Sequence, residues 1–218
     1  MTLYSFENAV FGNVTLDFKL EEGANLALAG LDETSTQNII DAMLGFVPPG
    51  AGQLFVSGEP TVRFSNKRWR QFRGTVGVVS NRFGLVSNLK VWENVLLPVS
   101  FHSEISSING QHSVVAKALD LSGFNGNPLA AVNTLSRLER KQILMARAFA
   151  MRPQLMIYDH YLDGHSYKEK QNLIRSVNQF TSRNENISCL YFVDETQDLT
   201  SAEHLHAVIV NQGGNYVH

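Results

Sequence analysis

Apolar residues recur at helical spacing over residues 138–151, and a short continuous apolar run follows at 155–158. Pro153 lies between them, and since it has no backbone N–H we expect the helix to end before it. An unbroken apolar run of this length is typical of a strand buried on both faces of a parallel sheet. Lys141 and Arg147 fall on the polar side of the helix, where we expect them to keep that face in water. The segment therefore predicts a surface helix followed by a buried strand.

The rest of the chain repeats this mixture of strand-like and helix-like patterns. The expected helical subdomain spans 101–132, with an amphipathic helix that turns Val114, Val115, Ala118, Leu119 and Leu121 inward. The predicted strands cover 2–18 (interrupted by a turn at Gly12-Asn13), 25–30, 53–56, 61–64 and 188–193, and further helices cover 36–44, 66–74 and 168–180. This mixture indicates an α/β domain.

Composition narrows the class of protein. The chain has 218 residues, 44% of them hydrophobic and 17% charged, which is enough for one globular domain with a sizeable core. A net charge of −2 gives no electrostatic case for nucleic acid, so the basic 66–74 segment is interpreted as a solvated helix. The single cysteine, Cys189, excludes a disulfide framework and favours a reducing compartment. No apolar run is long enough to span a membrane, no signal peptide is expected, and no spacing supports a metal site.

Residues 135–160, LSRLERKQILMARAFAMRPQLMIYDH, resemble the signature helix and Walker B strand of ATP-binding cassette (ABC) ATPases. In that frame Ser136 is the signature serine, and Asp159 ends the strand where ligands bind in open α/β sheets. Arg137-Leu138-Glu139 stand where the family has glycines and glutamine. His160 replaces the catalytic glutamate, and a neutral imidazole there could act as a base near pH 7. Asp159 and His160 are the candidate catalytic residues, with packing as the alternative for His160.

The segment from Gly30 to Gly45 resembles the family's phosphate loop, G-x-x-G-x-G-K-S-T…L-G, without a gap. The frame is kept, and we expect a phosphate loop in backbone geometry. Its content differs, because Glu33 and Ser35 replace glycines whose N–H groups approach phosphates at positive φ. Thr36 replaces the lysine, and Gln37 replaces the magnesium-binding hydroxyl.

Magnitudes argue against nucleotide in the usual pose. A charge-assisted hydrogen bond is worth roughly 1.5–3 kcal/mol, so losing the lysine costs roughly tenfold to a hundredfold in affinity. Asp32 and Glu33 add negative charge that a helix N-terminus, worth about +0.5 charge, does not offset. The positions that the resemblance assigns to nucleotide are Phe11 (against adenine, or alternatively a core aromatic), Gly30, Ser35, Thr36, Gln37, Asn38, Asn81 and Ser136.

Residues 77–98 resemble the family's strand, Q-loop and helix, with Asn81 in place of the glutamine that reaches magnesium. Family members grip a membrane permease just beyond this loop. The counterparts here are Phe83, Leu85, Val86 and Trp92. Exposed apolar residues mark a protein interface, and packing under the helical subdomain is the alternative.

The resemblance implies a P-loop NTPase (RecA-like) α/β core with an antiparallel β subdomain and an inserted α-helical subdomain. It treats 1–218 as one domain, with the core and β subdomain at 1–80 and 133–218 and the helical subdomain at 82–132. The implied function is that of a cassette docked on a membrane permease at the cytoplasmic face of the inner or plasma membrane, with ATP binding and hydrolysis impaired or lost.

Two alternatives stay open. One is a divergent but active ATPase that drives transport, of lipid for example, and the other is a scaffold without a transporter. ATP and magnesium are the family's cofactors, although we expect little binding of either here. The expected partners are the permease and a second cassette, identical or competent, and no nucleic acid.

Overall fold

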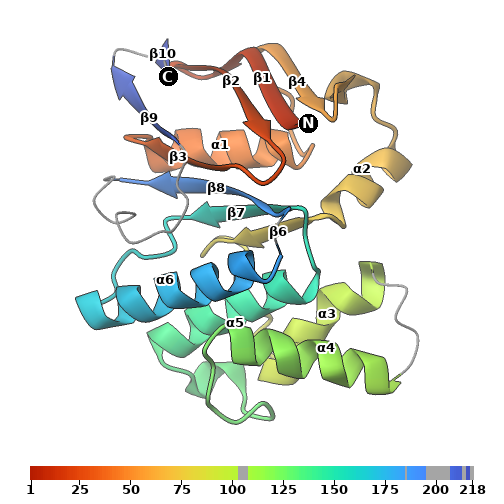
Figure 1. Ribbon diagram of the computed structural model, residues 1–218, viewed down its shortest axis with the longest axis vertical. Helices are drawn as coiled ribbons and strands as arrows, with labels where there is room; N and C mark the ends of the chain where they lie inside the picture. Colours follow the sequence, from red (N-terminus) through yellow and green to blue (C-terminus); the bar gives the residue numbers. More distant parts are fainter. Residues whose placement is uncertain (103–107, 185, 195–206, 213–214, 217–218) are drawn as a thin grey trace. The chain divides into compact units, whose positions relative to one another are not determined.

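The computed structural model describes residues 1–102, 108–184, 186–194, 207–212 and 215–216 (Figure 1). They form two compact units, one from Met1–Arg73 with the described part of 186–218, and one from the described part of Gly74–Glu185. The subdomain boundaries expected from the sequence stay a prediction. None of the described helices combines the length and hydropathy needed to cross a bilayer.

The first unit is built on strands ordered β5-β4-β1-β2-β10-β9-β3-β8. β1 pairs antiparallel with β2 and β4, whereas β3 pairs parallel with β8 and β9. The strands are β1 Thr2–Phe11, β2 Val14–Glu21, β3 Asn25–Ala29, β4 Ala51–Val56, β5 Glu59–Pro60, β8 Ser188–Val193, β9 Ala207–Gln212 and β10 Asn215–Tyr216. The helices are α1 Glu33–Met43, the 3-10 turn η1 Thr61–Arg63 and α2 Asn66–Arg73.

The core of this unit follows from the sequence pattern. β2 alternates buried and less buried residues, while β3 and β8 are buried along their whole length, as the continuous apolar runs predicted. Aromatic rings of the antiparallel strands pack together, with Phe6 stacked on Phe18 at 4.6 Å between centroids. Ile39, Ile40 and Met43 form the buried face of α1.

The second unit contains two parallel strands and the remaining helices. They are β6 Val76–Val79, α3 Val91–His102, α4 Ile108–Leu121, the 3-10 turn η2 Val132–Thr134, α5 Arg137–Ala150, β7 Leu155–Asp159 and α6 Tyr167–Ser182. Figure 1 shows α5 and α6 side by side, where Phe149 stacks on Phe180 at 4.0 Å. A Cβ on Gly77 of β6 would lie 2.5 Å from the Met156 sulfur and 3.2 Å from the Ala148 Cβ, so a larger residue here would force neighbouring side chains of β7 and α5 to move.

Most predicted elements are confirmed. α5 ends at Ala150 before Pro153, β7 occupies the predicted buried run, and α4 buries the predicted residues. The strand predicted at 61–64 is wrong, since Thr61–Arg63 form η1, and Val62 is 86% exposed. Pro60 has no N–H to extend the β4–β5 ladder, so the sheet ends there. Residues 204–214, which resemble the closing helix, strand and hairpin of ABC ATPases, lie partly outside the described residues, and β9 begins at Ala207.

Candidate functional site

The start of α1 differs from the predicted phosphate loop. Gly30 keeps a φ of +74°, but the helix begins at Glu33, three residues before the expected start at Thr36. Neither Glu33 nor Ser35 has a positive φ; both are helical residues. Their Cβ atoms disfavour the left-handed backbone of a phosphate cradle, whereas Asp32 is a favoured helix cap. The expected start of this helix at Thr36 is therefore wrong.

The Asp32 carboxylate occupies the N-terminus of α1. One carboxylate oxygen accepts a hydrogen bond from the Ser35 N–H at 2.7 Å, and the other accepts from the Ser35 hydroxyl at 3.1 Å. These bonds, the backbone N–H of Ser35 foremost, hold the pKa of Asp32 below its usual value. A helix N-terminus attracts anions. Here the chain supplies that anion itself.

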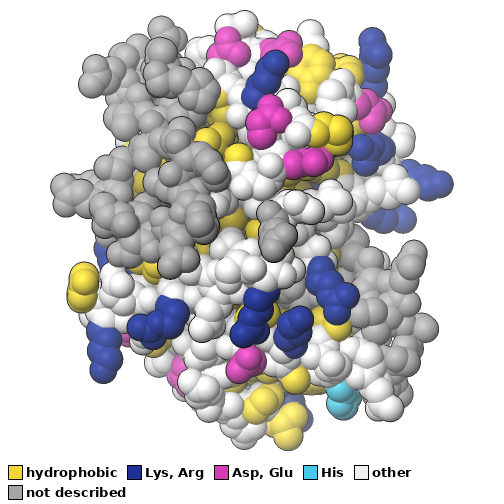
Figure 2. Space-filling model, in the orientation of Figure 1, with side chains coloured by type: hydrophobic (Ala, Val, Ile, Leu, Met, Phe, Trp, Pro, Cys, Tyr) yellow, Lys and Arg dark blue, Asp and Glu magenta, His cyan; other side chains and the backbone are white. Residues whose placement is uncertain are grey.

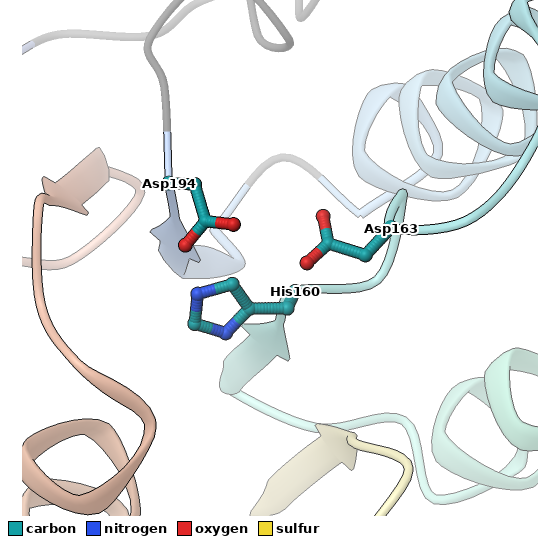
Figure 3. Close-up of side chains that lie close together, drawn as sticks. All are labelled: His160, Asp163 and Asp194. Carbon is teal, nitrogen blue, oxygen red and sulfur yellow. The ribbon is translucent and has the colours of Figure 1, made fainter.

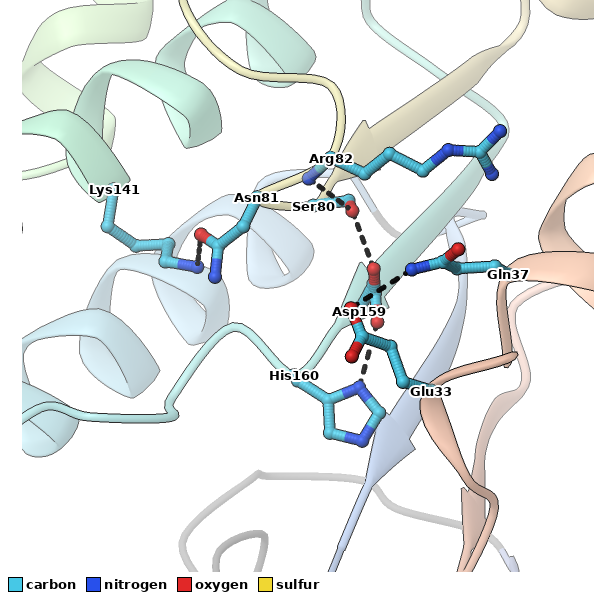
Figure 4. Close-up of polar contacts among 8 residues, drawn as sticks. All are labelled: Glu33, Gln37, Ser80, Asn81, Arg82, Lys141, Asp159 and His160. Carbon is cyan, nitrogen blue, oxygen red and sulfur yellow. Dashed lines mark hydrogen bonds and ion pairs between the residues drawn. The ribbon is translucent and has the colours of Figure 1, made fainter. Parts of the chain in front are cut away.

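The neighbouring positions are engaged or buried. The Gln37 side-chain amide donates to the Glu33 carboxylate at 3.0 Å (Figure 4). Thr36 is 1% exposed, and its hydroxyl has no hydrogen-bond partner within the part of the chain that the structure describes. Ser35 is buried and Asn38 is exposed. Phe11 is 4% exposed and lies edge-on to Phe6, so it is a core aromatic rather than an open platform for a base.

In the second unit, Asp159 lies at the end of β7 with both carboxylate oxygens hydrogen-bonded (Figure 4). Ser80 Oγ donates to one oxygen at 2.5 Å, and His160 Nδ1 lies 2.8 Å from the other. Burial opposes ionisation of Asp159, but these hydrogen bonds and the charges of His160 and Lys141 outweigh it and lower its pKa. The sequence did not predict the part played by Ser80.

His160 begins the loop that follows β7, and Figure 3 shows it with Asp163 on that loop. Its φ of +43° is unusual for a residue with a side chain, and its carbonyl accepts from the Asp163 N–H at 3.2 Å. One ring nitrogen is turned toward Asp159. An imidazole oriented in this way by a carboxylate has the arrangement of a base held in one tautomer.

Ser136 is the N-cap of α5 and forms a capping box with Glu139. The Glu139 carboxylate accepts from the Ser136 N–H at 2.8 Å and from its hydroxyl at 2.7 Å, and the Ser136 oxygen accepts from the Glu139 N–H at 3.3 Å. The Ser136 hydroxyl and N–H lower the pKa of Glu139. The S-x-x-E spacing is visible in the sequence and would have predicted this cap. The signature serine is thus committed to its own helix.

Lys141 and Arg147 are not in water, so that expectation is wrong. Lys141 is 4% exposed and its ammonium donates to the Asn81 side-chain oxygen at 2.8 Å. Burial lowers the pKa of Lys141 to about 8, although Asp159 and Asp163 act in the opposite direction. Arg147 is half-buried, and burial lowers its pKa. Helical periodicity treats both as surface residues, because it carries no information about the distant segment that packs over them.

The residues predicted to dock a permease form a mixed surface. Val86 is 38% exposed, whereas Phe83, Leu85 and Trp92 are half-buried. These four side chains are neither fully exposed nor part of the core. The surface therefore lies between the two predicted alternatives, an exposed interface and packing under the helical subdomain.

The first unit has a hollow of about 600 Å³ beside the chain that follows α1. Its lining includes Phe46, Pro49, Val62, Phe64 and Trp69, of which Phe46 is 55% exposed. Basic side chains gather near α2 (Figure 2), where Lys67, Arg68, Arg70 and Arg73 lie in one short helix. Apolar walls beside a basic helix favour an amphipathic, acidic partner.

Comparison with known proteins settles the family. A family model described as ABC transporter matches residues 14–162, which is more than half of the chain. The chain belongs to the ABC transporter family. The predicted family and the P-loop NTPase fold class are therefore confirmed, while the degeneracy of the catalytic motifs stays a prediction.

Relatives of this cassette are named for import. It is 26% identical over 183 residues to the phosphonates import ATP-binding protein PhnC of Treponema denticola, covering 81% of this chain and 71% of the relative. It is 25% identical over 207 residues to the putative 2-aminoethylphosphonate import ATP-binding protein PhnT of Salmonella typhimurium, covering 93% and 54%. It is 25% identical over 169 residues to the methionine import ATP-binding protein MetN 2 of Enterococcus faecalis, covering 75% and 48%. The cassette spans about half the length of the last two.

Solved structures show the same fold at low identity. The ATP-binding cassette MJ0796, in a dimeric post-hydrolysis state bound to ADP and Pi, gives a TM-score of 0.84 at 16% identity, covering 99% of this chain and 97% of that one. cbiO1 from Clostridium perfringens, part of the ABC transporter complex cbiONQ, gives 0.84 at 15% identity, covering 100% and 87%.

Proposed function

We propose that this chain is the cassette component of an import-type ABC transporter, docked on a membrane permease, in which ATP binding and hydrolysis are impaired or lost. The observation that supports this most directly is the Asp32 carboxylate on the Ser35 N–H at the start of α1. A triphosphate entering this helix end has to displace a bound carboxylate and then lie beside it. The start of α1 also lacks the family's lysine, whose charge-assisted hydrogen bond to a phosphate is worth roughly 1.5–3 kcal/mol.

The residues present do not fit ATP and magnesium, the family's cofactors. Magnesium takes oxygen ligands, but the Thr36 hydroxyl is buried and Gln37 supplies an amide that is already bonded to Glu33. Both oxygens of Asp159 accept hydrogen bonds within the chain or face His160.

Two surfaces support docking on a permease, one in the first unit and one in the second. One is the hollow with exposed Phe46 beside the basic helix α2, and the other contains Phe83, Leu85, Val86 and Trp92. We propose that a cytoplasmic segment of the permease binds these surfaces and holds the cassette at the cytoplasmic face of the membrane. A second cassette, identical or catalytically competent, completes the transporter, in keeping with the dimeric state named for MJ0796.

Calorimetric titration with Mg-ATP tests the proposal. We expect no binding in the micromolar range, while PhnC of Treponema denticola, purified in the same way, serves as the binding control. Micromolar affinity in this chain would overturn the proposal.

A matched pair of variants isolates Asp32. The triple variant Glu33→Gly, Ser35→Gly, Thr36→Lys restores the glycines and the lysine but keeps the capping carboxylate. The quadruple variant adds Asp32→Ser, which retains a capping hydroxyl without charge. We expect measurable Mg-ATP affinity only in the quadruple variant; equal affinity in both would show that Asp32 does not decide binding.

A second candidate function is a divergent, active ATPase, favoured by the His160 Nδ1 to Asp159 contact at 2.8 Å. Phosphate release by the complex co-purified with its permease separates the two. Turnover abolished by His160→Asn would favour this second candidate, whereas turnover unchanged by His160→Asn belongs to a partner cassette.

A further inference from the structure

Three of the four docking residues lie on an eleven-residue connection, and side chains of two helices form hydrogen bonds with it. Residues 80–90, called the connector below, join β6 to α3 and contain Phe83, Leu85 and Val86. No helix or strand of its own stabilises the connector beyond an isolated bridge at Lys90. The conformation of the connector therefore depends on its hydrogen bonds with side chains of the neighbouring helices.

Arg147 of α5 holds the first half of the connector. One guanidinium nitrogen donates to the Gly84 carbonyl at 2.8 Å, and the other donates to the Phe83 carbonyl. A planar guanidinium presents its donors as a rigid fork, so two successive carbonyls are fixed in orientation as well as in position. Lys141 adds a contact from the same helix, through the Asn81 side chain (Figure 4).

Asn94 of α3 holds the second half. Its side chain is 0% exposed, although it carries two donors and an acceptor. The side-chain oxygen accepts from the Val86 N–H at 2.7 Å, and the side-chain nitrogen lies within hydrogen-bond distance of the carbonyls of Val86, Leu89 and Lys90, at 3.1, 3.3 and 3.1 Å. Phe83, Leu85 and Val86 thus lie in the stretch held between the buried Asn94 amide and the half-buried Arg147 guanidinium.

We infer that Arg147 and Asn94 are positioning residues that hold the docking stretch 83–86 in one conformation without nucleotide. The inference rests on the proposed function, because a cassette that does not bind ATP needs another means of keeping its permease surface formed. A hydrogen bond to a charged group changes the equilibrium constant between the bonded and the open conformation by roughly tenfold to a hundredfold. Loss of the Arg147 fork should therefore raise the open fraction of the connector by about that factor.

Limited trypsin cleavage after Arg82 measures this opening. Arg82 is exposed, but cleavage requires the surrounding backbone to leave its hydrogen bonds, so the rate follows the open population. Arg147→Met is expected to raise the cleavage rate after Arg82 about tenfold to a hundredfold. Arg147→Lys, which keeps the charge but not the fork, should show an intermediate rise. Asn94→Ala should raise cleavage after Lys90 more than after Arg82.

Two internal controls keep the test decisive. Cleavage after Arg175 in α6 reports general unfolding, and Lys117→Met, on exposed α4 surface, is the matched control. A rise after Arg82 that only parallels the rise after Arg175 would overturn the inference, because it would mean loss of stability and not loss of positioning. If Arg147→Met does not fold, the rates in Arg147→Lys and Asn94→Ala decide in the same way.

Trypsin cleavage in the presence of excess Mg-ATP tests whether the nucleotide affects the connector. The wild-type cleavage rate after Arg82 is expected to stay unchanged, and protection by Mg-ATP would overturn the claim that the connector is held without nucleotide. The calorimetric titration is a separate measurement of the proposed function. Binding there, with cleavage after Arg82 still dependent on Arg147, would overturn only the proposed loss of ATP binding.

Discussion

Replacing Lys141 with methionine should make the protein more stable at neutral pH. Lys141 is 4% exposed, and burial lowers its pKa from 10.5 to about 8. Between these two values the unfolded chain binds more protons than the folded chain, so stability rises with pH across this window. Below pH 8 both states are protonated, and the whole cost of burying the ammonium is present. Each unit of pKa difference is worth about 1.4 kcal/mol, which puts that cost at about 3 kcal/mol.

Methionine keeps the length of the side chain and removes the charge, while Asn81 is exposed and can bond to water instead. We expect Lys141→Met to gain about 2–3 kcal/mol at pH 7 and nothing at pH 10.5. Urea unfolding at both pH values measures the difference, and comparison with wild type at each pH cancels the other titrating groups. Lys117→Met, at an exposed position, is the control. A loss of stability at pH 7, or a gain that does not depend on pH, would refute the reasoning.

Three smaller predictions concern single contacts. Ser136→Ala removes the cap of α5 and should cost about 1 kcal/mol of unfolding free energy, whereas Ser136→Asp should keep most of it. Gly77→Ala places a Cβ 2.5 Å from the Met156 sulfur and should cost about 1–3 kcal/mol, measured by urea unfolding. Asp159 has a lowered folded-state pKa, so its contribution to stability is present above the unfolded pKa of about 4 and fades as pH falls through the folded pKa. Acid unfolding of Asp159→Asn should lack that component, and an identical acid profile would contradict it.

The elements with strong periodicity could be predicted from the sequence. The helix at 138–151 ends before Pro153 because proline lacks the N–H, and the run at 155–158 is buried because nothing in it is polar enough to face water. The family frame added the order of the motifs. Both kinds of inference depend on residues close in the chain or on a resemblance of the whole chain.

The errors arose where a distant segment or a single cap decided the structure. Burial of Lys141 depends on contact with Asn81, 60 positions away in the chain, which no helical pattern contains. The early start of α1 depends on Asp32, whose carboxylate competes for the N–H groups that the family frame leaves for phosphate. Asp32 is a residue type that favours the N-cap of a helix, so the sequence offered a signal for the earlier start. The prediction followed the resemblance to a phosphate loop instead.

NMR of the Ser35 backbone amide, recorded while Mg-ATP is added, tests most directly whether Asp32 keeps phosphate from the start of α1. This amide donates to the Asp32 carboxylate at 2.7 Å and would have to change partner if a phosphate group occupied the helix end. The Ser35 resonance is expected to stay in place at excess Mg-ATP and to move when Asp32 is protonated at low pH. A saturable shift of the Ser35 resonance with Mg-ATP at neutral pH would contradict it.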